Sequence, residues 1–196
     1  MSGLESFLLR DRLERAGFTP SLFRYPSTQS LLPALTTALA ARLRSFDGTV
    51  HLVGHSLGGL VALETLERER ELPPGRVVLL GAPVQGSRAA DAVAAWSLGP
   101  RILGPLAVAE LTRPRERRWQ QSREIGLIAG TRSVGFGRFF ADLPAPNDGT
   151  VAVDETRLPG ATGHVVHDVS HIGMLMSAAV AGSLVEFLNT GSFGRN

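Results

Sequence analysis

The chain has 196 residues, 43% of them hydrophobic, and this size and composition fit one globular α/β domain with a sizeable core. All 20 basic residues are arginines and 18 residues are acidic, so the net charge of +2 is too small for the basic face of a nucleic-acid-binding protein. The absence of cysteine excludes disulfides, thiolate metal sites and a cysteine nucleophile.

The sequence contains no segment that predicts a membrane span or a signal peptide. The longest apolar run, residues 172–185, contains glycine and falls short of the roughly 18–20 residues needed to cross a bilayer. Acids and arginines interrupt the apolar residues near the N-terminus. We therefore expect a cytoplasmic protein without integral membrane association, and a solvated surface at the arginine-rich residues 113–119.

The first half of the chain alternates helical and extended patterns. Residues 2–17 predict a helix closed by a glycine, and residues 18–26 predict a short strand. A helix with an early proline is expected over 27–46, a buried strand over 49–54, and a helix over 57–71 that starts apolar and ends charged.

The second half continues the alternation after one irregular segment. A buried strand is expected over 76–83, followed by a long variable segment over about 84–122. Strands are predicted at 124–131 and 164–169, and a closing helix at 170–189. Strands separated by helices predict a mostly parallel sheet covered on both faces, with the ligand site at the carboxyl ends of the strands.

Residues 54–58 have the form Gly-x-Ser-x-Gly, directly after a strand and directly before a helix. This context is the one that a nucleophile elbow requires, because strained backbone angles push the serine hydroxyl out of the turn. Gly54 and Gly58 are expected to relieve crowding around Ser56, and Gly59 is expected to let the following helix pack tightly. The alternative is that Ser56 is an ordinary helix cap, and a phosphate-binding loop is excluded because the chain has no lysine.

A serine nucleophile needs a general base, and the chain offers five histidines. His51 is expected inside a strand, and His55 is expected to point away from the serine. His164 and His167 are three residues apart on a strand and so face opposite sides of the sheet, which also argues against a zinc site. His171 follows the last strand and lies at the carboxyl edge of the sheet, so it is the predicted base.

The third member of such a site is an acid that orients the imidazole. Asp148 lies in a Pro-Asn-Asp-Gly loop after the strand at 124–131, where functional side chains are commonly displayed, although Asn-Asp-Gly is also a plain turn signal. Asp154 is the reserve candidate, and Asp168 reads as a residue at a strand end.

Four segments in this order give the chain a family resemblance: HLVGHSLGG, GAPVQGS, PNDGTV and VSHIGML. They resemble the small bacterial lipase and esterase group of the α/β-hydrolase superfamily. The resemblance implies that Ser56 is the nucleophile, Asp148 the acid and His171 the base, and that no metal or organic cofactor is used. It implies an oxyanion hole that includes the Leu57 N–H, and a structural rim that comprises Gly81, Pro83, Gly86 and Ser87.

The chain departs from this group at its front, because relatives begin with a strand and a His-Gly loop that supplies a second oxyanion donor. The opening residues MSGLESF read as the end of that loop, which predicts a minimal fold lacking the usual N-terminal strand. The second donor is then expected from residues 1–3 or is missing, and upstream sequence would explain the gap equally well.

The expected reaction is hydrolysis of a small-molecule ester or lipid through an acyl-enzyme. The same residues would serve a thioesterase, acyltransferase or amidase, and a silent lipid- or partner-binding relative is the alternative outside catalysis. Trp96, Phe136 and Phe139 are candidate substrate-binding residues, and the segment 84–122, which also contains Trp119, either caps the site or packs on the core. The sequence predicts neither the acyl chain nor the oligomeric state.

Overall fold

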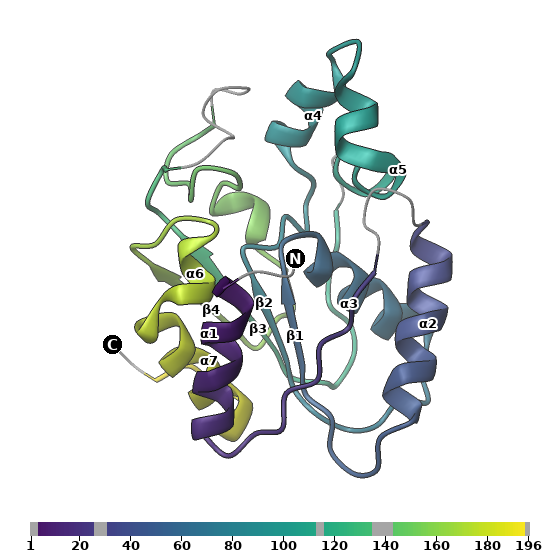
Figure 1. Ribbon diagram of the computed structural model, residues 1–196, viewed down its shortest axis with the longest axis vertical. Coiled ribbons are helices and arrows are strands. Elements are labelled where there is room, and N and C mark those ends of the chain that lie inside the picture. Colours follow the sequence, from purple (N-terminus) through teal and green to yellow (C-terminus); the bar gives the residue numbers. More distant parts are fainter. Residues whose placement is uncertain (1–3, 26–30, 113–115, 135–142, 195–196) are drawn as a thin grey trace.

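A parallel β-sheet of four strands forms the centre of the computed structural model, which describes residues 4–25, 31–112, 116–134 and 143–194 (Figure 1). The strands lie side by side in chain order: β1 (Leu52–His55), β2 (Val77–Leu80), β3 (Ile125–Gly130) and β4 (Gly163–His167). All three neighbouring pairs are parallel. The predicted architecture, a parallel sheet flanked by helices, is confirmed.

Helices connect the strands and cover both faces of the sheet (Figure 1). One face carries α1, α6 and α7, and the other carries α3, with α2 packed outside α3. The segment between β2 and β3 forms α4 and α5 above the carboxyl ends of the strands. The helices are α1 (Leu4–Arg15), α2 (Leu32–Arg44), α3 (Leu57–Arg68), α4 (Arg88–Ala94), α5 (Gly99–Leu111), the 3₁₀ turn η2 (Asp154–Thr156), α6 (Gly173–Met176) and α7 (Ala178–Thr190).

The side chains of β2 build the core on both faces of the sheet. Val77 and Leu79 point to the cluster that contains α3, whereas Val78 and Leu80 point to the cluster that contains α1, α6 and α7. All four are essentially inaccessible to solvent. A strand buried on both faces needs a continuous apolar run, which explains why the sequence predicted this strand and β3 well.

The strand predicted over residues 18–26 is wrong, because the described part of this segment, residues 18–25, contains no strand. A strand forms only where its backbone groups find a neighbouring strand, and β1 pairs with β2 alone among the described strands. As an edge strand β1 is also less buried than expected, and Val53 is 37% exposed.

The single closing helix predicted over 170–189 is two helices, α6 and α7, with a break at Ser177. Ser177 has an extended backbone, and its hydroxyl accepts a hydrogen bond from the N–H of Val180 at 3.3 Å. A serine at this position satisfies an orphan donor of the new helix. Ile172, directly before α6, is exposed.

The segment over 84–122 is partly core and partly surface. A non-helical glycine, Gly104, kinks α5 before Pro105, and the residues after the kink, such as Leu106, are buried in the core. Trp119 is also buried, and its indole N–H donates to the carbonyl of Arg123, so Trp119 is a core residue and no part of a cap. Trp96 is half exposed between α4 and α5.

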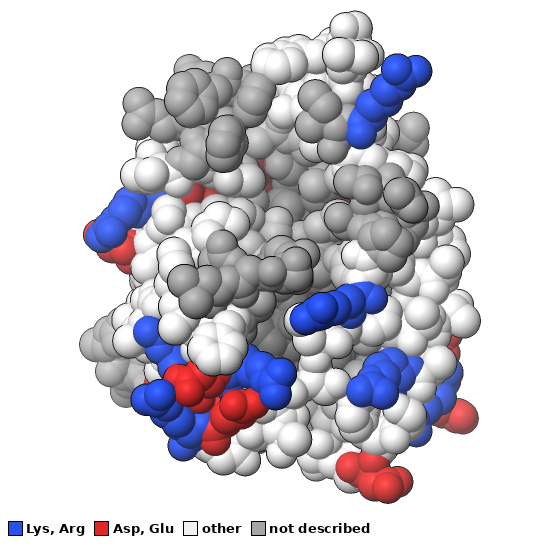
Figure 2. All heavy atoms as spheres, in the orientation of Figure 1, with Lys and Arg blue, Asp and Glu red and all other residues white. Residues whose placement is uncertain are grey.

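Several surface arginines are paired with acids. Figure 2 shows charges of both signs interspersed over α1 at the lower left, where Arg10 pairs with Glu14 and Arg15 with Asp11. The solvated surface predicted for residues 113–119 is wrong at Arg117, whose side chain is only 8% exposed and lies 3.0 Å from the carboxylate of Glu110. In the described part of the chain, no helix combines the length and the apolar character that a membrane span needs.

Candidate active site

Ser56 occupies the junction between β1 and α3 with a backbone that few residues adopt. Its φ is 53° and its ψ is −126°, and it is the only described residue other than glycine with a positive φ. Its N–H donates to the carbonyl of Leu80 on β2. Its hydroxyl makes no capping hydrogen bond to α3, so the helix-cap alternative has no support. Strain of this kind is characteristic of functional turns.

Glycines make the close approach of β1 and α3 possible, as expected at Gly54 and Gly59 but not at Gly58. A Cβ on Gly54 would lie 2.6 Å from the Cα of Gly59, and a Cβ on Gly59 would lie 2.6 Å from the Cβ of Ala82. A Cβ on Gly58 would meet only the hydroxyl of Tyr25, at 3.7 Å. The crowded pair is therefore Gly54 and Gly59, and the expected crowding at Gly58 is wrong.

We expect Gly54→Ala to lower the free energy of unfolding by about 1–3 kcal/mol, because backbone atoms block the new methyl group. Gly58→Ala, in the same turn, is expected to change it by no more than about 0.5 kcal/mol. Urea unfolding of the two variants beside the unmodified chain measures the difference. Equal stability of both variants would contradict this account of the elbow.

Asp148 is held almost completely out of solvent by its own loop, with 1% of its surface exposed. Its Oδ1 accepts hydrogen bonds from the N–H groups of Thr150 at 2.9 Å and Val151 at 2.7 Å. The preceding Asn147 closes the loop, because its amide donates to two carbonyls and its oxygen accepts from the N–H of Gly149. The Asn-Asp-Gly turn signal and the placement of the carboxylate are thus one feature.

His171 is buried beside Asp148 in the loop between β4 and α6. Its Nδ1 lies 2.7 Å from Asp148 Oδ2, and its backbone N–H donates to the Asp148 carbonyl at 2.9 Å. A carboxylate accepts, so Nδ1 carries the proton and the other nitrogen, Nε2, is free to accept one. This is the tautomer that a general base for a hydroxyl group needs.

Two strand-end glycines leave room for this pair. A Cβ on Gly81, after β2, would lie 3.1 Å from the Nδ1 of His171 and 3.2 Å from the Oδ2 of Asp148. A Cβ on Gly130, at the end of β3, would lie 2.8 Å from the Cβ of Asp148. The family resemblance pointed to Gly81 but not to Gly130. The position of Gly130 at the end of a buried strand was the one sequence feature that could have identified it.

His55 connects the elbow to the histidine loop, a role that the sequence reasoning missed. Its Nε2 lies 2.9 Å from the carbonyl oxygen of His171, and the two imidazole rings are 4.6 Å apart between centroids. Burial, followed by the nearby imidazole of His171, lowers the pKa of His55 to about 4. The hydroxyl of Ser56 makes no direct hydrogen bond to the imidazole of His171 in this structure. Hydrogen bonds between a nucleophile and its base commonly shorten only when substrate is bound.

The remaining histidines and acids lie away from this constellation. His164 bonds Thr156 and His167 bonds Ser183, on opposite sides of the sheet as predicted. Asp154 pairs with Arg88, and Asp168, directly after β4, pairs with Arg132. His51 precedes β1 instead of lying inside it. No group of three metal-ligating side chains occurs among the described residues.

The other predicted site residues are only partly described. Leu57 is the first residue of α3, so its N–H has no acceptor within the helix and is available to a ligand. Tyr25, which the sequence reasoning did not select, places its hydroxyl beside Gly58, and burial raises its pKa. Residues 1–3, Phe136 and Phe139 lie outside the described residues, and Trp96 is half exposed on the surface.

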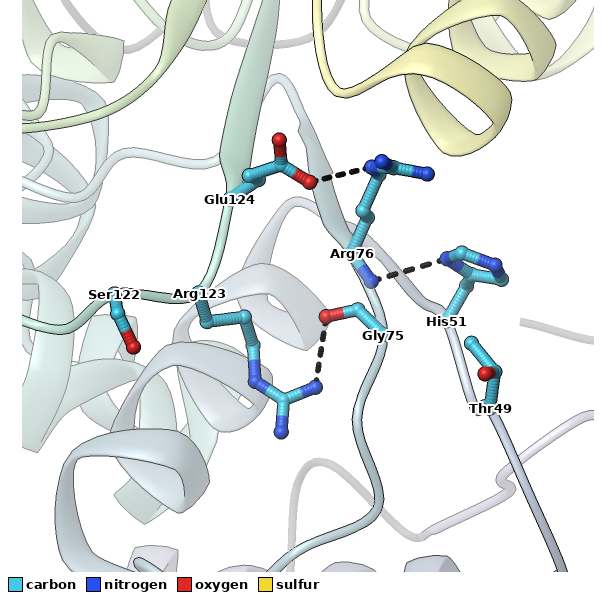
Figure 3. Close-up of a pocket in the computed structure, with 7 residues that line it drawn as sticks. All are labelled: Thr49, His51, Gly75, Arg76, Ser122, Arg123 and Glu124. Carbon is cyan, nitrogen blue, oxygen red and sulfur yellow. Dashed lines mark hydrogen bonds and ion pairs between the residues drawn. The ribbon is translucent and has the colours of Figure 1, made fainter.

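A hollow of about 400 Å³ lies at the opposite end of the sheet, near the amino ends of β1, β2 and β3 (Figure 3). Its charged groups already have partners within the protein. Arg76 bonds Glu124, and Arg123 donates to the carbonyls of Gly75 and Pro73. These contacts hold together the segments that precede β2 and β3. The hollow contains none of Ser56, Asp148 and His171 and is therefore separate from the candidate active site.

Comparison with known proteins gives one family and one fold. Residues 5–174 match the Alpha/beta hydrolase family, and no match was found among curated proteins. The mature lipase BlEst2 of Bacillus licheniformis is 22% identical with a TM-score of 0.65, covering 83% of this chain and 75% of its own.

Two further solved structures share the fold over almost the whole chain. A meta-cleavage product hydrolase of Pseudomonas fluorescens IP01 is 17% identical with a TM-score of 0.56, covering 94% of this chain and 84% of its own. The RedJ thioesterase of Streptomyces coelicolor is 18% identical with a TM-score of 0.52, covering 94% and 80%. Identities this low establish the shared fold alone.

Proposed function

The chain belongs to the alpha/beta hydrolase family, and on that basis we propose that it hydrolyses carboxylic esters through an acyl-enzyme on Ser56. One observation carries the proposal. A buried carboxylate, Asp148, holds the buried imidazole of His171 at 2.7 Å in the tautomer of a general base, and His55, the neighbour of Ser56, bonds the backbone of that same histidine. If the pair of Asp148 and His171 served stability alone, no strained serine would be needed next to His55.

The proposed reaction has two halves. In the first, His171 Nε2 takes the hydroxyl proton of Ser56 while the serine oxygen attacks the ester carbonyl, and the imidazolium then protonates the departing alcohol. In the second, His171 activates a water molecule that attacks the acyl-serine, and the proton it takes returns to the serine oxygen. Asp148 stabilises the imidazolium that forms twice in this cycle.

The negative oxygen of each tetrahedral intermediate needs donors that are in place before the reaction. We assign one of them to the N–H of Leu57, at the start of α3, where the helix dipole adds to the favourable field. Every proton transfer in this scheme is made by a side chain of this chain, so the proposed steps call for no metal or organic cofactor.

A fluorophosphonate probe tests the proposal, because it reacts with a serine only when a base activates the hydroxyl. We expect labelling of the purified chain at Ser56 and none in Ser56→Ala, with peptide mass mapping of the modified residue. A panel of acyl esters, thioesters and anilides of equal chain length then separates an esterase from a thioesterase or amidase. Absence of Ser56-dependent labelling would instead favour a silent binding protein.

A further inference from the structure

Among the described side chains, only that of His55 forms a hydrogen bond from the turn around Ser56 to the loop that carries His171. It is covalently next to Ser56 at the end of β1, and its Nε2 is 2.9 Å from the carbonyl oxygen of His171. The rings of His55 and His171 are tilted by 45° with their centroids 4.6 Å apart. His55 thus touches both the backbone and the ring of the proposed base.

We infer that His55 is a positioning residue, which fixes the distance between the nucleophile Ser56 and the base His171 through one hydrogen bond to the His171 carbonyl. The inference rests on the proposed function. The backbone of His171 is held on its other side by the carbonyl of Asp148, which accepts from the His171 N–H at 2.9 Å. With both backbone groups fixed, the imidazole has little freedom to move away from the serine.

The bond also defines the charge that His55 must carry. A carbonyl oxygen accepts, so Nε2 bears the proton and Nδ1 is an acceptor that is buried without a partner in the described structure. Protonation would create a buried donor with no acceptor, and would set a cation against the imidazolium that His171 becomes during the reaction. His171 and Asp148 are the charged groups that face His55, and the lowered pKa keeps it neutral above about pH 4.

Two amide variants separate the hydrogen bond from simple packing. In His55→Gln the side-chain amide nitrogen reaches the place of the imidazole Nε2, so the bond to the His171 carbonyl is retained. In His55→Asn the amide reaches only the place of Nδ1, and the bond is lost. His167→Gln, a histidine on β4 that bonds Ser183, is the matched control away from the site.

The measurement is fluorophosphonate labelling of Ser56, followed to completion from pH 5 to pH 9. The amplitude reports the fraction of molecules with a folded site, and the second-order rate constant reports the reactivity of each site. We expect full amplitude and a rate about 100-fold lower in His55→Asn at every pH, because a base misplaced by about 1 Å costs about that factor. His55→Gln and His167→Gln are expected to stay within about 3-fold of the unmodified chain.

The possible results separate the role of His55 from the proposed function. A purely structural role would lower the amplitude of His55→Asn but leave its rate constant unchanged, and would overturn the inference. A rate equally low in Gln and Asn would overturn it as well. If His55→Asn does not fold, His55→Met, which fills the same space without a donor, replaces it under the same criteria. Absence of Ser56 labelling in the unmodified chain would contradict the proposed function itself.

Discussion

Ser56→Ala and His171→Ala are each expected to lower kcat for ester hydrolysis by about 10⁶-fold, the size of effect seen when either member of a serine-histidine pair is removed. The physical reason is that neither group works without the other. An alkoxide does not form at neutral pH unless His171 takes the proton, and the proton transfer has no purpose unless the oxygen of Ser56 attacks.

The double variant provides the sharper test of this dependence. Two independent contributions would multiply to a loss far below detection, whereas residues that act as a unit give a double variant no slower than either single one. Initial rates with one activated ester at high enzyme concentration, for the single and double variants, measure the coupling. The residual activity is expected to reflect the oxyanion donor and substrate binding alone.

His164→Ala is the matched control for His171→Ala. His164 is half-buried and its Nε2 lies 2.9 Å from the hydroxyl of Thr156, but it lies outside the constellation around Ser56. We expect the kcat of His164→Ala to stay within about 3-fold of that of the unmodified chain, because His164 takes part in no proton transfer of the proposed reaction. A comparable loss in both histidine variants would show that folding, not proton transfer, explains the effect.

The sequence predicted the residues that terminate strands better than it predicted the edge of the sheet. Ser56 directly follows β1 and His171 lies in the loop after β4, so parallel pairing places both at the carboxyl edge of the sheet. Asp148 lies well beyond the end of β3, and the hydrogen bonds of its own loop hold its carboxylate. The strand over 18–26 failed for a related reason. Residues 18–26 have the composition of a strand, but a strand also needs a neighbouring strand to pair with. No local sequence pattern shows whether such a neighbour is present.

Contacts between loops were beyond the reach of the sequence. His55 was set aside because strand alternation turned it away from Ser56, yet the same direction carries its ring to the loop of His171. Spacing along one strand gives the direction of a side chain, but not the loop that it meets 116 residues later. Gly130 was missed likewise, since the need for a glycine there arises from Asp148 in another segment.

Asp148→Asn is expected to lower kcat by about 10⁴-fold while leaving the fold intact. The hydrogen bonds of the carboxylate determine how the new amide must be oriented. The N–H groups of Thr150 and Val151 donate to Oδ1, so the asparagine oxygen has to take that place. Its NH₂ group then faces the Nδ1 of His171 at the position of Oδ2.

This orientation reverses the tautomer of the base. A donor opposite Nδ1 forces that nitrogen to accept, which moves the proton of the neutral imidazole to Nε2, the atom that must receive the proton of Ser56. The alternative flip would set the amide against two backbone donors and is excluded by their repulsion. His171 is therefore present and well placed, but protonated on the wrong nitrogen.

Asp154→Asn separates this effect from the loss of a negative charge near the site. Asp154 was the reserve candidate for the acid, and its exposed carboxylate pairs with Arg88 on the surface, so its variant is expected to stay within about 2-fold in kcat. Steady-state kinetics of both variants, with circular dichroism to verify the fold, provide the comparison. A loss in Asp148→Asn below about 10-fold would mean that the Asp148 carboxylate does not set the tautomer of His171, and that its contact with the imidazole is structural.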